Sequence, residues 1–302
     1  MATTRKTTAA PESVRLDCLN RLLHIAKAGH TIALDPTSRA RRQVKPDGSI
    51  LTQTDLSISR LATAVVADLV ATGTHLLIDE EDKHVDSLFN AKKLAAPEYV
   101  WVIDPIDGTR PYAAGLPMYG ITIGILRHGK PWMGFCHYPA LNVLYLHDGQ
   151  SAWVIDAPFT TYEQRRPLAK AQTTLDETSV FYTTKSFARR FAIDAPDVFC
   201  VGAGILPLCW TANGLGCGTI FRGNLWDFAG AWALMTAAGL EMRSVGTNAA
   251  LASLDLAHFG ADTANPWRLN DDYLIAAPAL QTKLRARFSP LAPVGKPLRK
   301  AG

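Results

Sequence analysis

The stretch that decides how this chain folds is Trp101-Val102-Ile103-Asp104-Pro105-Ile106-Asp107-Gly108-Thr109. An apolar run from Tyr99 to Ile103 predicts a buried strand that ends directly at two aspartates. Asp104 and Asp107 are so close along the chain that their carboxylates repel each other unless a cation or a proton lies between them. The residues from Asp107 to Thr109 are typical of a helix start, whose free backbone N–H groups suit an anion. The stretch therefore favours a divalent metal beside a phosphate group.

A purely structural interpretation of the same residues stays open at this point. Asp104 can be a turn residue ahead of Pro105, and Asp107 an ordinary N-cap with Gly108 easing the turn. A short D-x-x-D-G-T match of this kind also occurs by chance. The rest of the chain has to decide between the two interpretations.

The composition is that of a globular protein with a sizeable core. The chain has 302 residues, of which 48% are hydrophobic and 19% charged, a length that suits one large or two ordinary domains. No apolar run is long enough to span a membrane, and residues 1–11 contain no apolar segment of signal-peptide length. The five cysteines form no C-x-x-C pair, which favours reduced thiols. We therefore expect a cytoplasmic protein with no membrane partner.

The net charge of +4 comes from one end of the chain. The last twenty residues contain six basic side chains and no acid, and without these six the net charge is −2. Residues 289–302 are rich in proline and basic residues, and we expect them to form a solvated tail. The body of the chain shows no basic face with interleaved aromatic residues, so nucleic acid is not an expected partner.

Residues 12–158 are predicted to form an N-terminal α+β domain. Apolar residues at helical spacing predict one helix over Glu12–Leu34 and a second from about Leu56. A short strand, Leu76–Ile78, leads into the acidic run that contains Glu80. After Gly120 the pattern alternates with period two between short turns, which indicates an antiparallel meander. Its four predicted strands are Ile121–Leu126, Trp132–Tyr138, Val143–Leu146 and Ala152–Ile155.

Residues 159–288 are predicted to form a C-terminal α/β domain, because strand and helix patterns alternate there. The predicted strands are Val180–Tyr182, Val198–Val201, Thr219–Phe221, Leu240–Arg243 and Tyr273–Ala277. The predicted helices are Ser186–Ile193, Gly204–Asn213, Trp226–Gly239 and Ala279–Phe288. Little regular structure is expected between Gly246 and Trp267.

Four acidic positions stand out as candidate ligands: Asp55, Glu80, the pair Asp104 and Asp107, and Asp227. Most of them lie where a predicted strand ends or a predicted helix begins, and side chains from distant segments converge at such ends. The set contains carboxylates without histidine or cysteine, which points to Mg²⁺ or Mn²⁺ rather than zinc.

These motifs resemble those of the inositol monophosphatase family, within the lithium-sensitive, Mg²⁺-dependent phosphatases. The resemblance covers residues 12–288 in order and spacing. It rests on four motifs: Thr52-Gln53-Thr54-Asp55, Asp79-Glu80-Glu81, the Trp101–Thr109 stretch, and Leu225-Trp226-Asp227-Phe228-Ala229-Gly230. The resemblance implies an alternating α-β-α-β-α sandwich of the inositol monophosphatase and fructose-1,6-bisphosphatase type. It also implies a metal-dependent phosphoric monoester hydrolase that is often a homodimer.

The resemblance implies a metal-ligand set. Glu80, Asp104 and the backbone carbonyl of Ile106 would hold a first Mg²⁺. Asp104, Asp107 and Asp227 would hold a second, so that Asp104 bridges the pair. A third, weaker metal near Glu80 is also implied.

Catalytic and phosphate-binding roles follow from the same resemblance. Gly108 and Thr109 would present backbone N–H groups to the phosphate. Asp55 and the Thr109 hydroxyl would orient and help deprotonate a metal-bound water, with Glu80 as a further catalytic residue. The segment that begins at Gly202 and Ala203 matches the family's substrate-side loop.

The chain departs from the family pattern at two arginines. Arg110 follows Thr109, where many inositol monophosphatases have a small polar residue, and this resembles histidinol-phosphate phosphatases more. Near Arg222 the family usually has acids that accept sugar hydroxyls, whereas this chain has Cys217 and either Phe221 or Arg222 at those places. Arg222 argues mildly for a substrate with an extra anionic or flat group, although it can equally point to solvent.

The sequence therefore predicts a phosphomonoesterase that hydrolyses a small phosphorylated polyol, sugar or amino alcohol by a direct attack of water. Histidinol phosphate and 3′-phosphoadenosine 5′-phosphate are alternative substrates. A non-catalytic phosphate-binding protein on the same fold is the alternative from another class. That alternative would be expected to have lost at least one ligand, and each predicted metal position here keeps its carboxylate.

Overall fold

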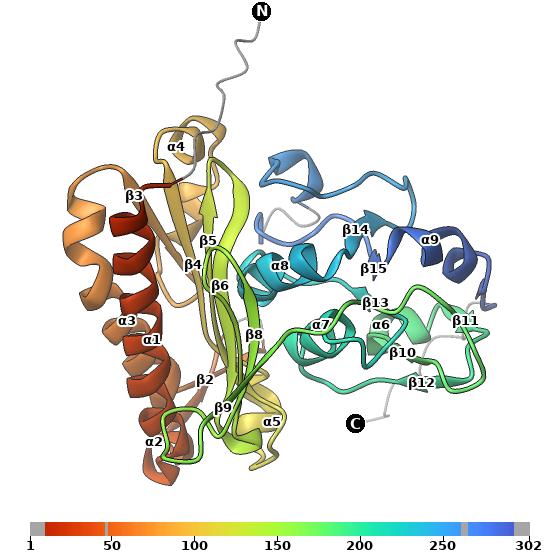
Figure 1. Cartoon of the computed structure of the whole chain (residues 1–302), viewed down its shortest axis with the longest axis horizontal. Helices are drawn as coiled ribbons and strands as arrows, with labels where there is room; N and C mark the ends of the chain where they lie inside the picture. The colour runs from red at the N-terminus through yellow and green to blue at the C-terminus, as the bar shows by residue number, and fades with distance from the viewer. Residues whose placement is uncertain (1–9, 46–47, 261–264, 293–302) are drawn as a thin grey trace, which may run out of the picture.

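Helices and sheets alternate in five layers across the described part of the chain (Figure 1). The structure is a computed structural model, and it describes residues 10–45, 48–260 and 265–292. The layers run from the pair α1 and α3, through a large sheet, the pair α7 and α8, and a smaller sheet, to α6 and α9. This order confirms the predicted α-β-α-β-α sandwich.

The large sheet is built from consecutive segments, and its strands are neighbours in chain order. Only β3 and β4 are parallel; the other pairs are antiparallel. Its strands are β3 (His75–Asp79), β4 (Tyr99–Asp107), β5 (Gly120–Arg127), β6 (Lys130–Tyr138), β7 (Val143–His147), β8 (Ala152–Asp156) and β9 (Gln164–Pro167). The predicted meander corresponds to β5–β8. The sheet continues through β9, past residue 158, where the sequence placed the domain division.

The outer face of this sheet is covered by α1 (Glu12–Leu34), which has the predicted bounds, and by α3 (Gln53–Ala71), which begins before the predicted start near Leu56. Both helices bury apolar residues at helical spacing against the sheet. The buried set includes Leu22, Ile25 and Ala26 of α1, Ile58, Ala62 and Val66 of α3, and Trp101, Ile103, Ile121 and Ile123 of the sheet. In chain order, α1 and α3 are connected by α2 (Pro36–Ala40) and by the hairpin of β1 (Arg42–Val44) and β2 (Ile50–Thr52).

The inner face is covered by α7 (Ile205–Ala212) and α8 (Trp226–Ala238). Helix α8 lies unusually close to β5 and β6 because glycines face each other there. A Cβ atom on Gly124 would lie 2.3 Å from the Ala229 carbonyl oxygen, and one on Gly230 would lie 2.0 Å from Thr122 Oγ1. This close approach fixes the N-terminus of α8, and with it Asp227, beside the end of β4.

The smaller sheet has the order β12-β10-β13-β15-β14. Its strands are β10 (Val180–Tyr182), β12 (Asp197–Phe199), β13 (Gly218–Phe221), β14 (Glu241–Ser244) and β15 (Tyr273–Ala276). Its far face packs on α6 (Lys185–Ala188) and α9 (Pro278–Arg285) through a third apolar core. The short elements are α4 (Ala91–Ala95), α5 (Thr109–Ala113) and the 3₁₀ turns Val85–Leu88, Pro139–Leu141 and Leu256–His258.

Two predicted helices of the second half are shorter than expected. Helix α6 ends at Ala188, and Phe191–Ile193 instead forms β11. Helix α9 ends at Arg285, and Phe288–Pro290 forms β16, which pairs with β11. The backbone hydrogen bonds of this pair outweigh the local helical pattern. The pairing also draws the first residues of the predicted tail into the fold, whereas residues 293–302 lie outside the described residues.

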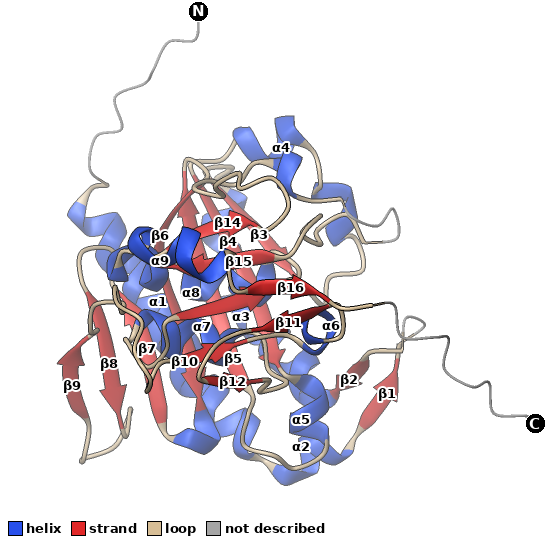
Figure 2. Ribbon diagram, turned by 90° about the vertical axis from the view of Figure 1, so that its right-hand side faces the viewer, coloured by secondary structure: helices blue, strands red, loops and turns tan. Residues whose placement is uncertain are grey.

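Two hairpins lie at opposite edges of the molecule. Figure 2 shows β8 and β9 at one edge and the β1–β2 hairpin at the opposite edge.

In the described ranges, no helix is both long and apolar enough to cross a membrane.

Candidate active site

A cavity of about 300 Å³ lies where β4, α5, α7, β13 and α8 meet. This is the lower end of the volumes usual for small-molecule sites. Its lining contains most of the residues predicted from the sequence: Glu80, Asp104, Ile106, Asp107, Gly108, Thr109, Ala203, Arg222 and Asp227. Asp55, Arg110 and Gly202 are the predicted site residues that do not line it.

Three carboxylates form a cluster in this cavity. Ligand oxygens of Glu80, Asp104 and Asp227 all lie within 4.8 Å of one another. Asp104 is buried, and its Oδ1 atom has no hydrogen-bond partner among the described residues. Lys45 approaches from the β1–β2 hairpin, with its Nζ atom 3.7 Å from Glu80 and 2.9 Å from Glu81. One lysine shared between two acids leaves the cluster with an excess of negative charge.

The pKa values of these carboxyls reflect that excess. Burial, and then the charges of Glu80, Asp107 and Asp227, raise the pKa of Asp104 well above its usual value. Burial, followed by Asp227 and Glu81, does the same for the pKa of Glu80. Burial raises the pKa of Asp227 to about 7. Such pKa values are expected where buried acids lie close together with too little positive charge among them.

The backbone explains how the acids converge. Asp104 ends the regular part of β4, and Glu80 follows β3, the parallel neighbour, with its N–H donating to the Ile103 carbonyl at 3.2 Å. Residues three apart in a regular strand point to opposite faces. The pairing with β5 shifts by one residue between Asp104 and Asp107. This bulge allows both side chains to reach the same cavity.

Asp107 also makes hydrogen bonds to a distant helix, which the sequence did not reveal. Its Oδ1 and Oδ2 atoms accept hydrogen bonds from the backbone N–H groups of Gly204 at 3.2 Å and Ile205 at 3.1 Å. Asp107 therefore caps α7, a helix almost a hundred residues further along the chain. Burial raises its pKa to about 6 although these two hydrogen bonds lower it.

Gly108 joins β4 to α5 in a conformation that favours glycine. Its φ is +78°, and a Cβ atom there would lie 2.7 Å from the Met118 carbonyl oxygen and 3.3 Å from Ala203 Cβ. The backbone can thus turn sharply beside the carboxylates and start α5 at the cavity wall.

We expect Gly108→Ala to lower both stability and activity. The left-handed conformation and the contact with Met118 together should reduce the free energy of unfolding by about 1–3 kcal/mol. The start of α5 should also move, so that the phosphatase activity expected from the sequence falls by more than the folded fraction does. Urea unfolding and initial rates measure the two effects. Gly73→Ala is the matched control, because Gly73 also has positive φ, +74°, but meets no atom within 4 Å; equal effects of both substitutions would contradict the steric argument.

Asp55 and Thr109 are not joined by a hydrogen bond in the described residues. Asp55 is buried at the start of α3, where its Oδ2 atom accepts hydrogen bonds from the N–H and hydroxyl groups of Thr52 at 2.8 and 2.5 Å. The Thr109 hydroxyl donates to the Ile106 carbonyl at 3.0 Å. Burial raises the pKa of Asp55 to about 6. The geometry places Thr109 at the cavity and Asp55 in the capping box of α3.

The two unusual arginines have different surroundings. Arg110 points away from the cavity, and its Nη2 atom donates to the Gly48 carbonyl at 2.6 Å. Arg222, just after β13, lines the cavity. The sequence alone did not distinguish these two positions.

Several cavity residues were not foreseen. Thr183 and Thr184 reach the cavity from the end of β10, where Thr184 caps α6, and Thr219 reaches it from β13. Asn224 donates its backbone N–H to Asp227 Oδ2 at 2.7 Å. The only sequence signal for these residues is the T-T-K-S run before α6, which is typical of a helix cap.

The comparisons with known proteins agree with this geometry. The sequence model of the inositol monophosphatase family matches residues 20–284. The chain belongs to the inositol monophosphatase family. The family and the predicted phosphoric monoester hydrolase class are thereby confirmed.

Individual relatives show how far the similarity extends. The inositol-1-monophosphatase ImpA of Mycolicibacterium smegmatis is 28% identical over 262 residues, which cover 82% of this chain and 83% of the relative. A histidinol-phosphatase of Chlorobaculum parvum is 31% identical over 144 residues, 46% of this chain and 51% of the relative. The solved structure of a Thermotoga maritima IMPase superposes with a TM-score of 0.63 at 16% identity, over 90% of this chain and 96% of that one.

Proposed function

We propose that this protein is a Mg²⁺-dependent phosphomonoesterase that hydrolyses a small phosphorylated metabolite. The observation that supports this most directly is the cluster of Glu80, Asp104 and Asp227 oxygens within 4.8 Å, beside the start of α5. Family membership supports the reaction class. A non-catalytic binding protein is the weaker alternative, since each predicted carboxylate is present and most of them meet in one cavity.

The residues fit hard divalent cations. An unpartnered buried oxygen of Asp104 and the raised pKa values of Glu80 and Asp227 are what a site for a cation would show. Glu80, Asp104 and the Ile106 carbonyl would hold one ion, and Asp104, Asp107 and Asp227 another. A third ion near Glu80 and replacement by Mn²⁺ belong to the same proposal. When bound, the ions would acidify water and stabilise charge on the phosphoryl oxygens.

The chain's own groups would position the phosphate and the water. The backbone at Gly108 and Thr109 faces the cavity and would receive the phosphate oxygens. While the Thr109 hydroxyl donates to Ile106, its oxygen can accept a hydrogen bond from the attacking water. The water oxygen bonds to phosphorus and the phosphorus–oxygen bond to the alcohol breaks; one proton of the water ends on the leaving alcohol and the other on the phosphate. On the basis of family resemblance, Asp55 and the Thr109 hydroxyl would orient this water and help deprotonate it, although the Asp55 side chain lies in the capping box of α3 and does not line the cavity.

The substrate class includes polyol, sugar and amino-alcohol phosphates. Histidinol phosphate is a specific candidate because a histidinol-phosphatase is among the relatives. 3′-Phosphoadenosine 5′-phosphate is a further candidate from the sequence. Inhibition by Li⁺, a homodimeric state and a cytoplasmic location are also part of the proposal, on the basis of family resemblance.

The proposal is tested by phosphate release from a panel of phosphate monoesters with Mg²⁺, with Mn²⁺, with Li⁺ added and with EDTA. We expect Asp227→Asn to lower the Mg²⁺-dependent rate by a factor of at least about 100, since it removes one carboxylate from the cluster. Asp197→Asn, on the exposed strand β12, is the control. Release that is unaffected by EDTA would overturn the metal proposal, and no release from any ester would overturn the phosphatase proposal.

A further inference from the structure

One charged side chain in the cavity is not used by the proposed hydrolysis. Beyond the metal cluster and Asp107, the polar side chains of the lining are Thr109, Thr183, Thr184, Thr219, Asn224 and Arg222. The four lining acids are therefore all accounted for by the metal proposal. The part of the cavity left for the alcohol portion of a substrate has hydroxyls, one amide and one guanidinium.

Arg222 is poorly paired for an arginine in such a place. Its Nε atom is buried without a hydrogen-bond partner, and its Nη2 atom reaches only the Asn270 carbonyl, at 3.5 Å. Within the described ranges it forms no ion pair. A half-buried guanidinium normally finds an anion, because its donors are costly to leave unpaired.

The neighbouring acid is engaged elsewhere. Asp271 follows Asn270, but its Oδ2 atom accepts from Ser244 Oγ at 2.5 Å and from the Gly246 N–H at 2.7 Å. Its Oδ1 atom accepts from the Asp272 N–H at 2.7 Å. Asp271 is near enough for its charge to interact with that of Arg222. Its hydrogen bonds nevertheless hold the carboxylate toward the loop after β14, so the Arg222 fork keeps donors available for a ligand.

We propose that Arg222 binds a second anionic group of the substrate, so that the preferred substrate is a phosphate monoester that also carries a carboxylate or another phosphate. This inference rests on the proposed function for the first phosphate, which the metal cluster would bind. A planar guanidinium suits either anion, since it can donate two parallel hydrogen bonds to both.

The positive charge of Arg222 argues against a substrate with an ammonium group. The cavity carboxylates that could bind a cation are those assigned to the metals, and Arg222 would repel an amine placed beside it. Arg110 cannot take the same role in this conformation, because it donates to Gly48 outside the cavity. The inference therefore disfavours histidinol phosphate, despite the similarity to a histidinol-phosphatase.

The test uses three esters of the same three-carbon size: 3-phosphoglycerate, glycerol 3-phosphate and serinol phosphate. Their alcohol portions are anionic, neutral and cationic. For the unaltered protein with Mg²⁺, we expect kcat/KM to be at least about tenfold higher for 3-phosphoglycerate than for glycerol 3-phosphate, and lowest for serinol phosphate. Arg222→Gln should bring the first two within about threefold by lowering the value for 3-phosphoglycerate alone. Arg222→Lys should keep part of the preference.

Binding is measured separately with phosphonates, which cannot be hydrolysed. Isothermal titration compares 2-hydroxy-4-phosphonobutyrate with 3,4-dihydroxybutylphosphonate, in the same Mg²⁺ buffer. We expect the carboxylated compound to bind about tenfold more tightly, and Arg222→Gln to remove the difference. Arg189→Gln is the matched control, because Arg189 is an exposed arginine of the same domain that does not line the cavity.

The outcomes separate the two proposals. Equal losses for all three esters in Arg222→Gln, or an unchanged ratio, would overturn the role of Arg222. The absence of a phosphonate preference in the unaltered protein would do the same. If no ester is hydrolysed but the Arg222-dependent phosphonate preference is found, the proposed hydrolysis fails and the second anion site stands.

Discussion

Replacing Asp104 with asparagine is expected to abolish phosphatase activity while making the metal-free protein more stable. Activity should fall by a factor of at least about 1,000, because Asp104 is the carboxylate proposed to bridge both metal positions. The free energy of unfolding in EDTA at pH 8 should rise by about 1–3 kcal/mol. Initial rates and urea unfolding of the same preparations measure both changes.

The loss of activity and the gain of metal-free stability have one physical cause. Asp104 is buried among Glu80, Asp107 and Asp227, and these neighbours together with burial raise its pKa well above the usual value. At pH 8, without metal, the folded state must therefore either hold a buried charge or take up a proton. Asparagine has the same shape and no charge, so the repulsion disappears. The carboxylates that are proposed to bind metal would thus lower the stability of the metal-free protein.

Metal addition provides the second half of this test. Mg²⁺ should raise the unfolding temperature of the unaltered protein, since a ligand that binds only the folded state stabilises it. The Asp104→Asn variant should respond far less. Asp86→Asn, an exposed aspartate in the 3₁₀ turn Val85–Leu88, is the control and should behave like the unaltered protein. A variant that is less stable in EDTA, or that keeps its activity, would contradict the metal-cluster explanation.

The parts of the fold that the sequence predicts are those with local signals. The strands β5–β8 are short, mostly apolar runs between turns, and α8 is closed by Gly239, whose φ of +84° suits the residue after a helix. The pair β11 and β16 has no such signal. It joins Phe191 to Pro290 through strands of three residues, and only the tertiary structure brings these segments together.

The candidate site likewise has residues with a local sequence signal and contacts without one. The carboxylates were predictable because each lies in a compact motif at the end of a strand or the start of a helix. The capping of α7 by Asp107 was not, since the helix lies almost a hundred residues away. The different positions of Arg110 and Arg222 also depend on contacts with distant carbonyls, Gly48 and Asn270. Sequence patterns indicate the candidate catalytic groups, whereas the surroundings of the two arginines depend on long-range packing.

Acid is expected to destabilise the protein through His137, far from the carboxylate cluster in the chain. His137 of β6 is fully buried, and its Nδ1 atom lies 3.1 Å from the Val143 carbonyl, which can only accept a hydrogen bond. Its Nε2 atom must then accept from His30 Nδ1, 2.9 Å away on α1. Protonation of His137 would either place its Nε2–H group against the Nδ1–H group of His30 or force His30 into its other tautomer. Burial, and then His30, lower the pKa of His137 to about 3.

The sign of the effect follows from linkage. The pKa of an unfolded histidine is near 6.5, so below that pH the unfolded chain binds a proton that His137 in the folded state does not. The stabilisation is complete above pH 6.5 and is lost as the pH falls toward 3. Each pH unit in this window removes up to about 1.4 kcal/mol. The site carboxylates act in the opposite direction, because their raised pKa values make the metal-free folded state bind more protons than the unfolded chain.

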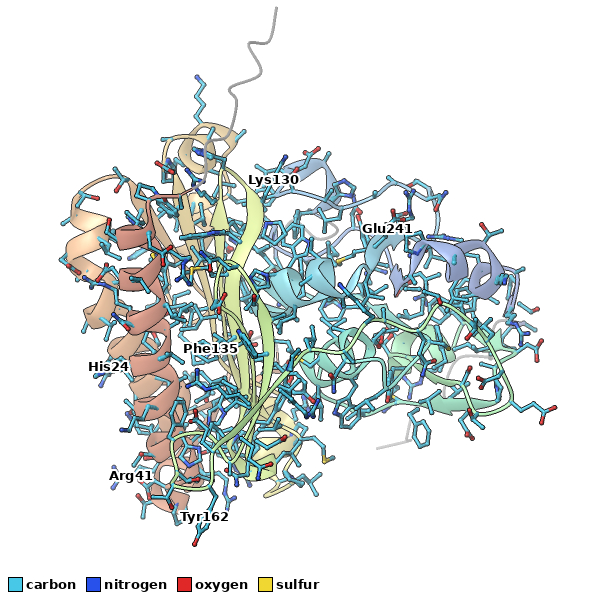
Figure 3. The ribbon with its side chains drawn as sticks, viewed as in Figure 1. His24, Arg41, Lys130, Phe135, Tyr162 and Glu241 are labelled. Carbon is cyan, nitrogen blue, oxygen red and sulfur yellow. The ribbon has the colours of Figure 1, made fainter. Side chains whose placement is uncertain are left out.

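The difference in unfolding free energy between the unaltered protein and a His137 variant separates the effect of His137 from that of the carboxylates. His137→Leu should be less stable than the unaltered protein at pH 7, because it leaves the Val143 carbonyl and His30 without their partner. The gap should narrow by up to about 3 kcal/mol at pH 4, since only the unaltered protein loses the histidine contribution. His24→Gln is the control, because His24 lies exposed at the surface of α1 (Figure 3). A gap that stays constant from pH 7 to pH 4 in urea unfolding would mean that His137 takes up its proton inside the folded protein, and the His30–Val143 bridge would then not hold it neutral.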